Sequence, residues 1–182
     1  MHSNIHTRLE RTIVVSAALL GALTLTACGS MSASPKATAT AKLEATQGNG
    51  ASGMVRFDQY DGKVVVSGEV SGLKPNGEHG FHVHDKGDCS SGDGMSTGGH
   101  FNPTAKPHGH HGHGEHHTGD LPSLKADASG VAKFSFESTS LTVGEGATNV
   151  VGRGLIVHRD PDDLKTQPTG NSGPRVACAV IR

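Results

Sequence analysis

Short segments in which apolar and polar residues alternate are spread along the chain from residue 53 onward. The clearest is KVVVSGEV at 63–70, which lies between the turn-forming sequences DG and SG. Because successive side chains of a β-strand point to opposite faces, an alternation with a period of two predicts a strand. Shorter runs that predict strands in the same way lie at 53–57, 79–84, 131–136, 150–157 and 176–181.

The segments between these runs are rich in Gly, Pro and Asp, and no segment of ten or more residues shows a helical period with caps. This pattern predicts an all-β fold, an antiparallel sandwich or barrel. Two connections, 85–124 and 159–174, are much longer than the rest. Long connections in a compact domain are usually functional or disordered, and the histidines lie in or beside these two. We therefore expect both connections to be functional.

Composition adds to this picture and narrows the function classes. The 182 residues suffice for one ordinary domain with its own core. With 26 glycines, 3% aromatic residues and no tryptophan, the chain is expected to have many turns and a core of small aliphatic side chains. The formal net charge is -1 and there is no arginine-rich run. These features argue against nucleic acid as a partner.

The N-terminus has the pattern of an export signal. Arg8 and Arg11 precede an apolar stretch that ends in LTAC, a sequence that looks like a bacterial lipobox. We therefore expect a lipoprotein signal peptide at 1–27 and a lipid anchor on Cys28. An ordinary signal peptide with an incidental cysteine is the alternative. A membrane-spanning helix is disfavoured, because the apolar stretch is shorter than the ~20 residues needed to cross a bilayer.

Residues 28–41 are mainly Ser, Ala, Thr and Lys, without periodic apolar positions. A segment of this composition cannot bury enough surface to order itself. We expect a flexible tether at 28–41 and the folded domain at 42–182. Gly29 and Ser30 lack the aspartate that retains some bacterial lipoproteins at the inner membrane. The expected location is therefore the cell envelope, lipid-anchored to the outer membrane and facing the periplasm.

Two cysteines, Cys89 and Cys178, remain once Cys28 is set aside as the anchor. An even number of cysteines in an exported chain predicts a disulfide, because that compartment is oxidising. Two buried free thiols are the alternative. The bridge would tie the long connection after His84 to the last predicted strand, close to Arg175.

The candidate chemistry is concentrated in the histidines, of which the chain has 13. His82 and His84 stand two apart in GFHVH, so in a strand their side chains leave the same face. His158 ends another apolar strand, GLIVH. A second group lies on the first long connection and consists of His100, His108, His117 and Asp120. Because a carboxylate beside imidazoles suits zinc, the sequence predicts a metal site here.

The chain contains eight motifs in this order: GFHVH, GGHFNP, PHG, HTGD, GLIVH, DDL, TGNSG and PRVACAVI. Together they resemble the copper,zinc superoxide dismutase family, and the resemblance extends from about Lys42 to Arg182. The short connection between His84 and Cys89 is similar to that of the bacterial periplasmic members. The resemblance implies an eight-stranded antiparallel Greek-key β-barrel, an immunoglobulin-like sandwich with two long functional loops.

The resemblance also implies two metals, copper and zinc. The residues that match the copper ligands are His82, His84, His100 and His158. The residues that match the zinc ligands are His100, His108, His117 and Asp120. His100 would therefore be an imidazolate bridge between the two metals. Asp162 matches the aspartate that joins one ligand of each metal, here His82 and His108.

The implied reaction converts superoxide to dioxygen and hydrogen peroxide by alternate reduction and reoxidation of copper, with no organic cofactor. An exported enzyme of this kind would protect the cell envelope from superoxide. Arg175 matches the arginine at the mouth of the copper channel, where it would attract the anion, and Thr169 matches the residue that narrows the channel. We expect His100 to take a proton and deliver it to the nascent peroxide.

Four further histidines lie in the tract 107–117, namely His110, His111, His113 and His116. In one interpretation they are ordinary solvated loop residues. In another they capture or relay metal while the inner sites are assembled. They also leave the zinc set open to a local shift, in which His110 or His116 takes the place of His108 or His117.

Two rival functions use the same histidines. A surface lipoprotein that buffers copper or zinc would need neither Arg175 nor Asp162. A noncatalytic relative that serves as a copper chaperone would typically lack some ligands, and here none is missing. The connection from His84 to Cys89 is shorter than in the eukaryotic branch of the family, and the loop from His158 to Arg175 is also short. The eukaryotic dimer interface therefore does not transfer directly, and a monomer and a homodimer both remain open.

Overall fold

The computed structural model of the protein describes residues 33–182, so the predicted signal peptide at 1–27 and the predicted anchor Cys28 lie outside the described residues. The strands of the described part are β1 Ala37–Ala45, β2 Ser52–Tyr60, β3 Lys63–Ser71, β4 Glu78–His79, β5 Phe81–His84, β6 Leu124–Lys125, β7 Ala132–Ser138, β8 Gly154–His158 and β9 Arg175–Val180. The only helix among residues 33–182 is a 3-10 turn at Met95–Thr97. A search of the same residues finds no helix with the length and hydropathy of a membrane span.

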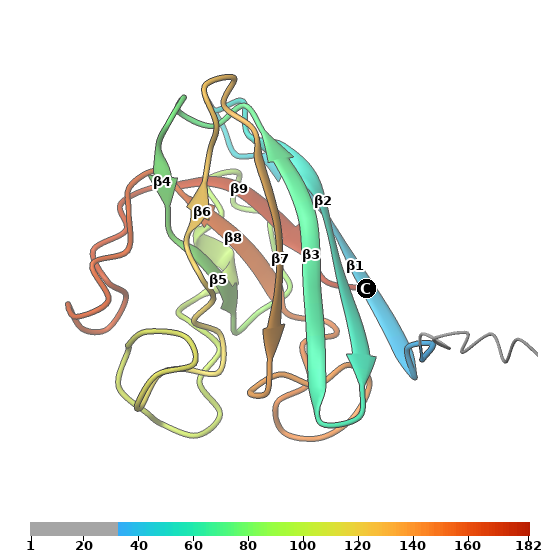
Figure 1. Cartoon of the computed structure of the whole chain (residues 1–182). Coiled ribbons are helices and arrows are strands. Elements are labelled where there is room, and N and C mark those ends of the chain that lie inside the picture. The colour runs from blue at the N-terminus through green and yellow to red at the C-terminus, as the bar shows by residue number, and fades with distance from the viewer. Residues whose placement is uncertain (1–32) are drawn as a thin grey trace, which may run out of the picture. The chain divides into compact units, whose positions relative to one another are not determined.

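Seven of the strands form one antiparallel sheet in the order β5-β8-β9-β1-β2-β3-β7, and β4 pairs separately with β6. Strand β1 pairs with β2 along seven residues but with β9 only at Glu44 and Ala45. The sheet therefore folds over at β1. Figure 1 shows the two resulting layers, with β1, β2, β3 and β7 in front and β5, β8 and β9 crossing behind them.

The order of the strands is that of a Greek key. Strand β3 pairs with β7 and not with β4, its successor in the chain. The chain thus leaves the front layer after β3, contributes β5 to the back layer, and returns. Only Gly80 separates β4 from β5, so these two count as one interrupted strand and the total is eight. The predicted all-β antiparallel Greek-key sandwich is confirmed.

Strand β1 starts before Lys42, where the sequence predicted the folded domain to begin. Residues 37–41 belong to the sheet and not to a flexible tether. In the sequence ATATAKLEA the side chains of Ala39, Ala41 and Leu43 are buried, and their neighbours are exposed. The alternation was present in the sequence, but alanine carries so little apolar surface that the segment resembled a linker in composition.

The inner faces of the two layers form one apolar core of small and medium side chains. Its largest fully buried members include Phe57, Phe81, Phe101, Leu43 and Leu155. On β5 the strand alternation sends Phe81 and Val83 into this core. The same alternation sends His82 and His84 to the opposite face. Burial of the two apolar side chains stabilises the fold by about 25 cal/mol for each Å² of apolar surface removed from water. The same burial fixes the direction in which the two histidines point.

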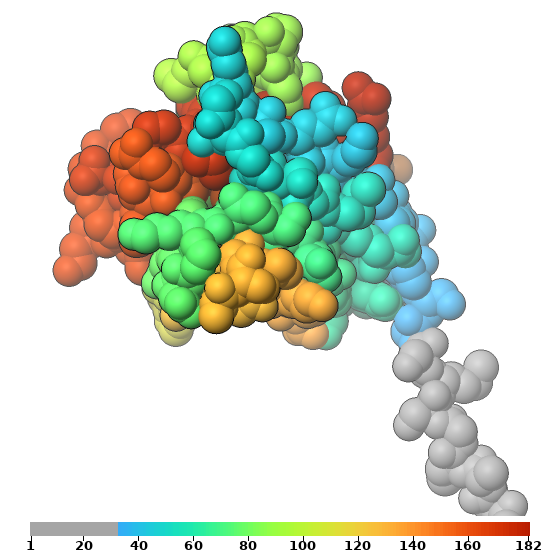
Figure 2. Space-filling view, turned by 90° about the horizontal axis from the view of Figure 1, so that it is seen from above, coloured from blue at the N-terminus to red at the C-terminus, as the bar shows by residue number. Residues whose placement is uncertain are grey.

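The two long connections are present as predicted, at 85–123 between β5 and β6 and at 159–174 between β8 and β9. In Figure 2 the start of the first, in yellow-green, and the second, in orange-red, protrude from the body of strands. A disulfide between Cys89 and Cys178 joins the first connection to β9. The predicted bridge is confirmed, and it fastens a functional loop to the sheet.

Candidate metal centre

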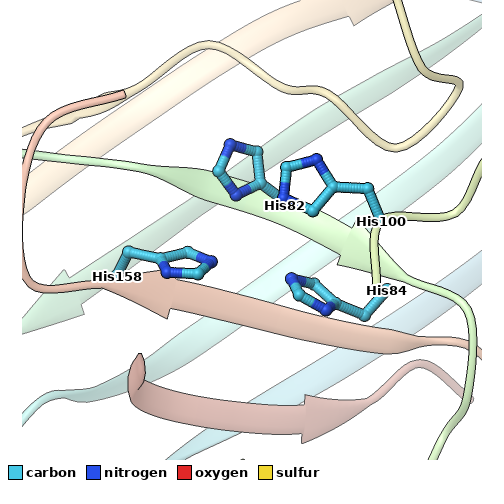
Figure 3. Close-up of side chains that lie close together, drawn as sticks. All are labelled: His82, His84, His100 and His158. Atoms are coloured by element: carbon cyan, nitrogen blue, oxygen red, sulfur yellow. The ribbon is translucent and has the colours of Figure 1, made fainter. Parts of the chain in front are cut away.

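Four histidine rings surround a common space on the outer face of β5 and β8 (Figure 3). His82 and His84 come from β5, and His158 is the last residue of β8. His100 lies on the first long loop, which a bridge to His84 holds beside β5. The distances between ring centroids range from 4.0 Å, for His82 and His100, to 6.5 Å, for His100 and His158. One ring nitrogen of each histidine lies within 4.8 Å of the other three.

One nitrogen of each ring is tied to an oxygen atom. The pairs are His82 Nε2 with Asp162 Oδ2 at 2.8 Å, His84 Nδ1 with Gly98 O at 2.9 Å, His100 Nδ1 with Asp120 Oδ1 at 2.8 Å, and His158 Nδ1 with Gly173 O at 3.0 Å. Such contacts orient a ring and leave its other nitrogen as the free electron-pair donor. The rings are therefore held with their second nitrogens available.

Those second nitrogens are buried and lack any hydrogen-bond partner within residues 33–182. They are His82 Nδ1, His84 Nε2, His100 Nε2 and His158 Nε2. An unpaired buried polar atom costs about 1 to 3 kcal/mol, so four close together require a compensating partner. A metal ion bound by four imidazoles supplies that partner, and imidazole is a preferred ligand of copper. The donor atoms thus fit the predicted copper set.

A second cluster lies on the other side of His100. One atom from each of His100, His108, His117 and Asp120 lies within 4.8 Å of the others. The Oδ1 atom of Asp120 is 2.8 Å from His100 Nδ1, 3.0 Å from His108 Nδ1 and 3.3 Å from His117 Nδ1. Its Oδ2 atom accepts the backbone N–H groups of Gly109 and His117, at 3.1 and 2.9 Å. Three imidazoles and a fixed carboxylate fit closed tetrahedral zinc.

His100 belongs to both clusters, with Nδ1 in the second and Nε2 in the first. The structure therefore brings together all seven residues that the resemblance assigned as ligands. His110 and His116 lie in neither cluster. The arrangement has His108 and His117 as members of the second cluster, as predicted, without the alternative shift.

Asp162 links the clusters a second time. Its Oδ2 accepts a hydrogen bond from His82 Nε2 at 2.8 Å, and its Oδ1 accepts one from His108 Nε2 at 2.9 Å. The contact requires glycine at position 170, where φ is +65°. A Cβ atom there would lie 1.8 Å from Asp162 Oδ1 and 2.6 Å from His108 Nε2. Gly170 thus provides the space in which the carboxylate reaches both rings.

Burial sets the protonation of the four-histidine cluster. It lowers the pKa of His100 to about 4 and that of His158 to about 3. It also lowers the pKa of His82, and it places the pKa of His84 well below the usual value. These imidazoles are therefore neutral at pH 7, which is the form that binds a metal.

The carboxyl groups of Asp120 and Asp162 are ionised, as metal binding requires. Burial by itself would raise the pKa of Asp120 and Asp162, but hydrogen bonds from the surrounding histidines hold both pKa values well below the usual range. Burial opposes a charge on His108 as well, yet its bonds to the two carboxylates raise its pKa to about 9. A metal bound at His108 Nδ1 would displace the proton that this nitrogen donates to Asp120, and Nε2 would keep its bond to Asp162.

Arg175 lies at the edge of the four-histidine cluster, paired in register with His158. Its Nη1 donates to Gly94 O at 2.5 Å and to Thr97 Oγ1 at 2.8 Å, and its Nη2 donates to Gly98 O at 2.7 Å. The carbonyl of Gly98 also accepts from His84. The side chain is therefore a fixed positive charge that shares an anchoring oxygen with a ligand of the cluster.

Thr169 and His79 belong to neither histidine cluster. Thr169, predicted to narrow the channel, is half-buried in the second long loop, and its carbonyl is 3.4 Å from Ser172 Oγ. His79 was not predicted. Its Nδ1 donates to the carbonyl of His158 at 2.9 Å, which fixes the backbone of that ligand. Nothing in the sequence around His79, which lies three residues before His82, distinguished it from the other histidines.

Gln167 is another positioning residue that the sequence did not indicate. Its Oε1 accepts from the N–H of His108 at 2.8 Å, and its Nε2 donates to the carbonyl of His108 at 2.9 Å. A side-chain amide thus pairs with both backbone groups of a zinc-cluster residue. Amide side chains are common in loops, so only the fold could place this one against His108.

Replacing Gln167 by Ala should weaken zinc binding by about tenfold, the lower end of what outer contacts to metal ligands contribute. Copper binding should be unchanged, because His108 is not part of the four-histidine cluster. Competition with chelators, measured for each metal, would separate the two effects. The exposed Lys165, replaced by Ala, is the control in the same loop. Unchanged zinc binding, or an equal loss of both metals, would contradict the positioning role.

Comparison with known families matches residues 51–181 to the family described as copper/zinc superoxide dismutase (SODC). The chain is 40% identical over 135 residues to a superoxide dismutase (Cu-Zn) of Paramecium bursaria Chlorella virus 1, covering 71% of each protein. It is 43% identical over 140 residues to a superoxide dismutase (Cu-Zn) of Saccharomyces cerevisiae, covering 72% of this chain and 90% of that protein.

A solved structure, a crystal structure of the clock protein EA4, is similar to the fold described above. It superposes with a TM-score of 0.73 at 40% sequence identity, over 82% of this chain and 95% of that one. The family match spans most of the sandwich and both histidine clusters. The chain therefore belongs to the copper/zinc superoxide dismutase family.

Proposed function

We propose that the chain converts two superoxide ions and two protons into dioxygen and hydrogen peroxide, with copper in the four-histidine cluster and zinc in the second cluster. The observation that carries this assignment is the position of His100. Its two nitrogens face different clusters, and its free nitrogen is one of four buried atoms that need a metal. Family membership supports the same reaction and the same two metals.

When bound, copper supplies the one-electron couple that superoxide alternately reduces and reoxidises, and zinc supplies a fixed positive charge behind His100. The contribution of the chain is orientation. In every ring of the first cluster, one nitrogen is held by an oxygen acceptor, so that the other nitrogen is directed at the metal position. Because these side chains are already oriented, little free energy is spent on rearranging them during turnover.

His100 is the residue placed to move a proton. Its Nδ1 is committed to Asp120 and the second cluster, so Nε2 is the atom that can take a proton and release it. Hydrogen peroxide requires two protons for each molecule formed. One comes from His100 Nε2 and the other from solvent, and the ring is reprotonated for the next cycle.

Arg175 is placed to bind the anion. A guanidinium has five N–H donors, and three of those of Arg175 are used by Gly94, Thr97 and Gly98. The remaining donors can bind an oxygen of superoxide beside the cluster. A fixed cation also raises the local concentration of an anionic substrate and speeds its arrival.

The fixed arginine separates this function from that of a metal buffer. A protein that only stores copper or zinc gains nothing from a cation beside the metal, since like charge weakens binding. A noncatalytic chaperone relative is disfavoured for a different reason, because every ligand position is filled and assembled. Of the three functions, only that of a superoxide dismutase gives a role to Arg175 as well as to every residue of the two clusters.

Replacing Arg175 by Glu should lower kcat/KM for superoxide by at least about tenfold, because a steering cation becomes a repelling anion. Both metals should stay bound, since Arg175 contacts neither cluster as a ligand. Arg159→Glu, an exposed charge change in the neighbouring loop, is the control and should have a small effect. Pulse-radiolysis rates at several ionic strengths, with metal content measured on the same samples, test this. An unchanged rate for Arg175→Glu refutes the role.

We also propose that the protein is exported and anchored by lipid on Cys28, so that it protects the cell envelope from superoxide. Support comes from LTAC at the end of the apolar stretch and from the disulfide, which an oxidising compartment favours. Two or more acyl chains give stable attachment, at about 0.8 kcal/mol for each buried CH₂ group.

Expression in a Gram-negative host with labelled palmitate tests the anchor. The wild-type chain should carry label and sediment with the outer membrane. Cys28→Ala should lose the label and appear in the soluble fraction. Gly29→Asp should stay labelled but move to the inner membrane. Lack of label on the wild type, or label on Cys28→Ala, would disprove anchoring at this residue.

A further inference from the structure

The loop between two zinc-cluster residues, His108 and His117, contains four histidines that belong to neither inner cluster. They are His110, His111, His113 and His116. The four lie close together in the sequence, but their side chains differ in exposure. His110 and His113 are exposed, whereas His111 and His116 are half-buried.

His111 holds the loop against the rest of the domain. Its Nδ1 is 2.9 Å from the carbonyl of Asp120, and its Nε2 is 3.3 Å from the carbonyl of Glu137 on β7. Its ring also packs edge-on against Phe136, with centroids 5.6 Å apart. Because both nitrogens face carbonyl oxygens, this ring is not available to a metal.

His110 and His113 form a pair at the tip of the loop. The N–H of His113 donates to the carbonyl of His110 at 3.1 Å, which closes a turn. Gly112 takes the positive φ of 76° within that turn. The two ring centroids lie 4.7 Å apart, inside the range of 4.0 to 6.5 Å found in the four-histidine cluster.

The orientation of His110 follows the same rule as the inner ligands. Its Nδ1 donates to the carbonyl of His111 at 2.7 Å, which leaves Nε2 as the free donor. A hollow of about 180 Å³ adjoins this ring and is also lined by Glu78 and Lys125, whose charges are opposite. The hollow has room for water molecules.

We propose that His110 and His113 form a third transition-metal site, open to solvent, which takes Zn²⁺ or Cu²⁺. Imidazole suits both ions, and water from the adjoining hollow completes the coordination. The site lies on the segment that joins His108 to His117. It captures metal from solvent and holds it next to the cluster into which zinc must enter. This second role rests on the proposed zinc site, but the existence of the outer site does not.

Equilibrium dialysis of the protein, already loaded with copper and zinc, against added Zn²⁺ tests the outer site. The wild type should bind an additional equivalent beyond the two inner metals. The double variant His110→Gln with His113→Gln should bind that equivalent at least about tenfold more weakly, since it loses both imidazole ligands. His116→Gln, a half-buried histidine of the same loop, is the matched control and should retain it.

Side-chain NMR locates the added ion. Substoichiometric Cu²⁺ should broaden the ring signals of His110 and His113 before that of His116. Dismutation by the fully loaded double variant should equal that of the wild type, because neither residue contacts the inner clusters. Absence of the additional equivalent, its survival in the double variant, or its loss in His116→Gln would overturn the outer site.

The capture role has a separate readout. Metal-free protein given less than one equivalent of zinc should fill the inner zinc cluster several times more slowly in the double variant than in the wild type or His116→Gln. Equal filling rates would overturn capture while leaving the outer site in place. Failure of the inner cluster to bind zinc in any variant would instead count against the proposed function.

Discussion

The centre depends on the orientation of one ring, that of His100. Its Nδ1 faces the carboxylate of Asp120 at 2.8 Å, and its Nε2 is buried among three other imidazoles. The ring cannot turn without removing a donor from each cluster. The two clusters are therefore a single unit, and Asp162 links them again through His82 and His108. Two independent links keep both donor sets in fixed relation.

The sandwich and its disulfide supply the rigidity that this unit needs. Burial of Phe81 and Val83 orients β5, and the bridge from Cys89 to Cys178 holds the first long loop against β9. A bridge that closes a loop of 89 residues contributes about 4 to 5 kcal/mol in the chain-entropy model. The same loop presents the carbonyl of Gly98 to both Arg175 and His84. The guanidinium of Arg175 and one ring of the four-histidine cluster are thus anchored by the same carbonyl.

The sequence predicted much of this because strand alternation and histidine spacing are local signals. The pair in GFHVH needed only the period of a strand to share a face, and His158 stood at the end of another predicted strand, whereas the place of His100 in both clusters came from the resemblance. Other features depend on distant segments that only the folded chain brings together. Gln167 reaches the backbone of His108, and Gly170 leaves space for Asp162. Strand β1 was not among the predicted strands, because alternation of alanine with polar residues is a weak apolar signal.

The most direct test of the two-metal centre is whether His100 joins the two metals. Protein loaded with Cu²⁺ in the first cluster and Co²⁺ in place of zinc should show strong magnetic coupling through the shared imidazole. The low-temperature electron paramagnetic resonance signal of Cu²⁺ should then be lost, and it should return when Co²⁺ is replaced by Zn²⁺. A full Cu²⁺ signal in the copper and cobalt protein, with both metals bound, would contradict the shared ligand.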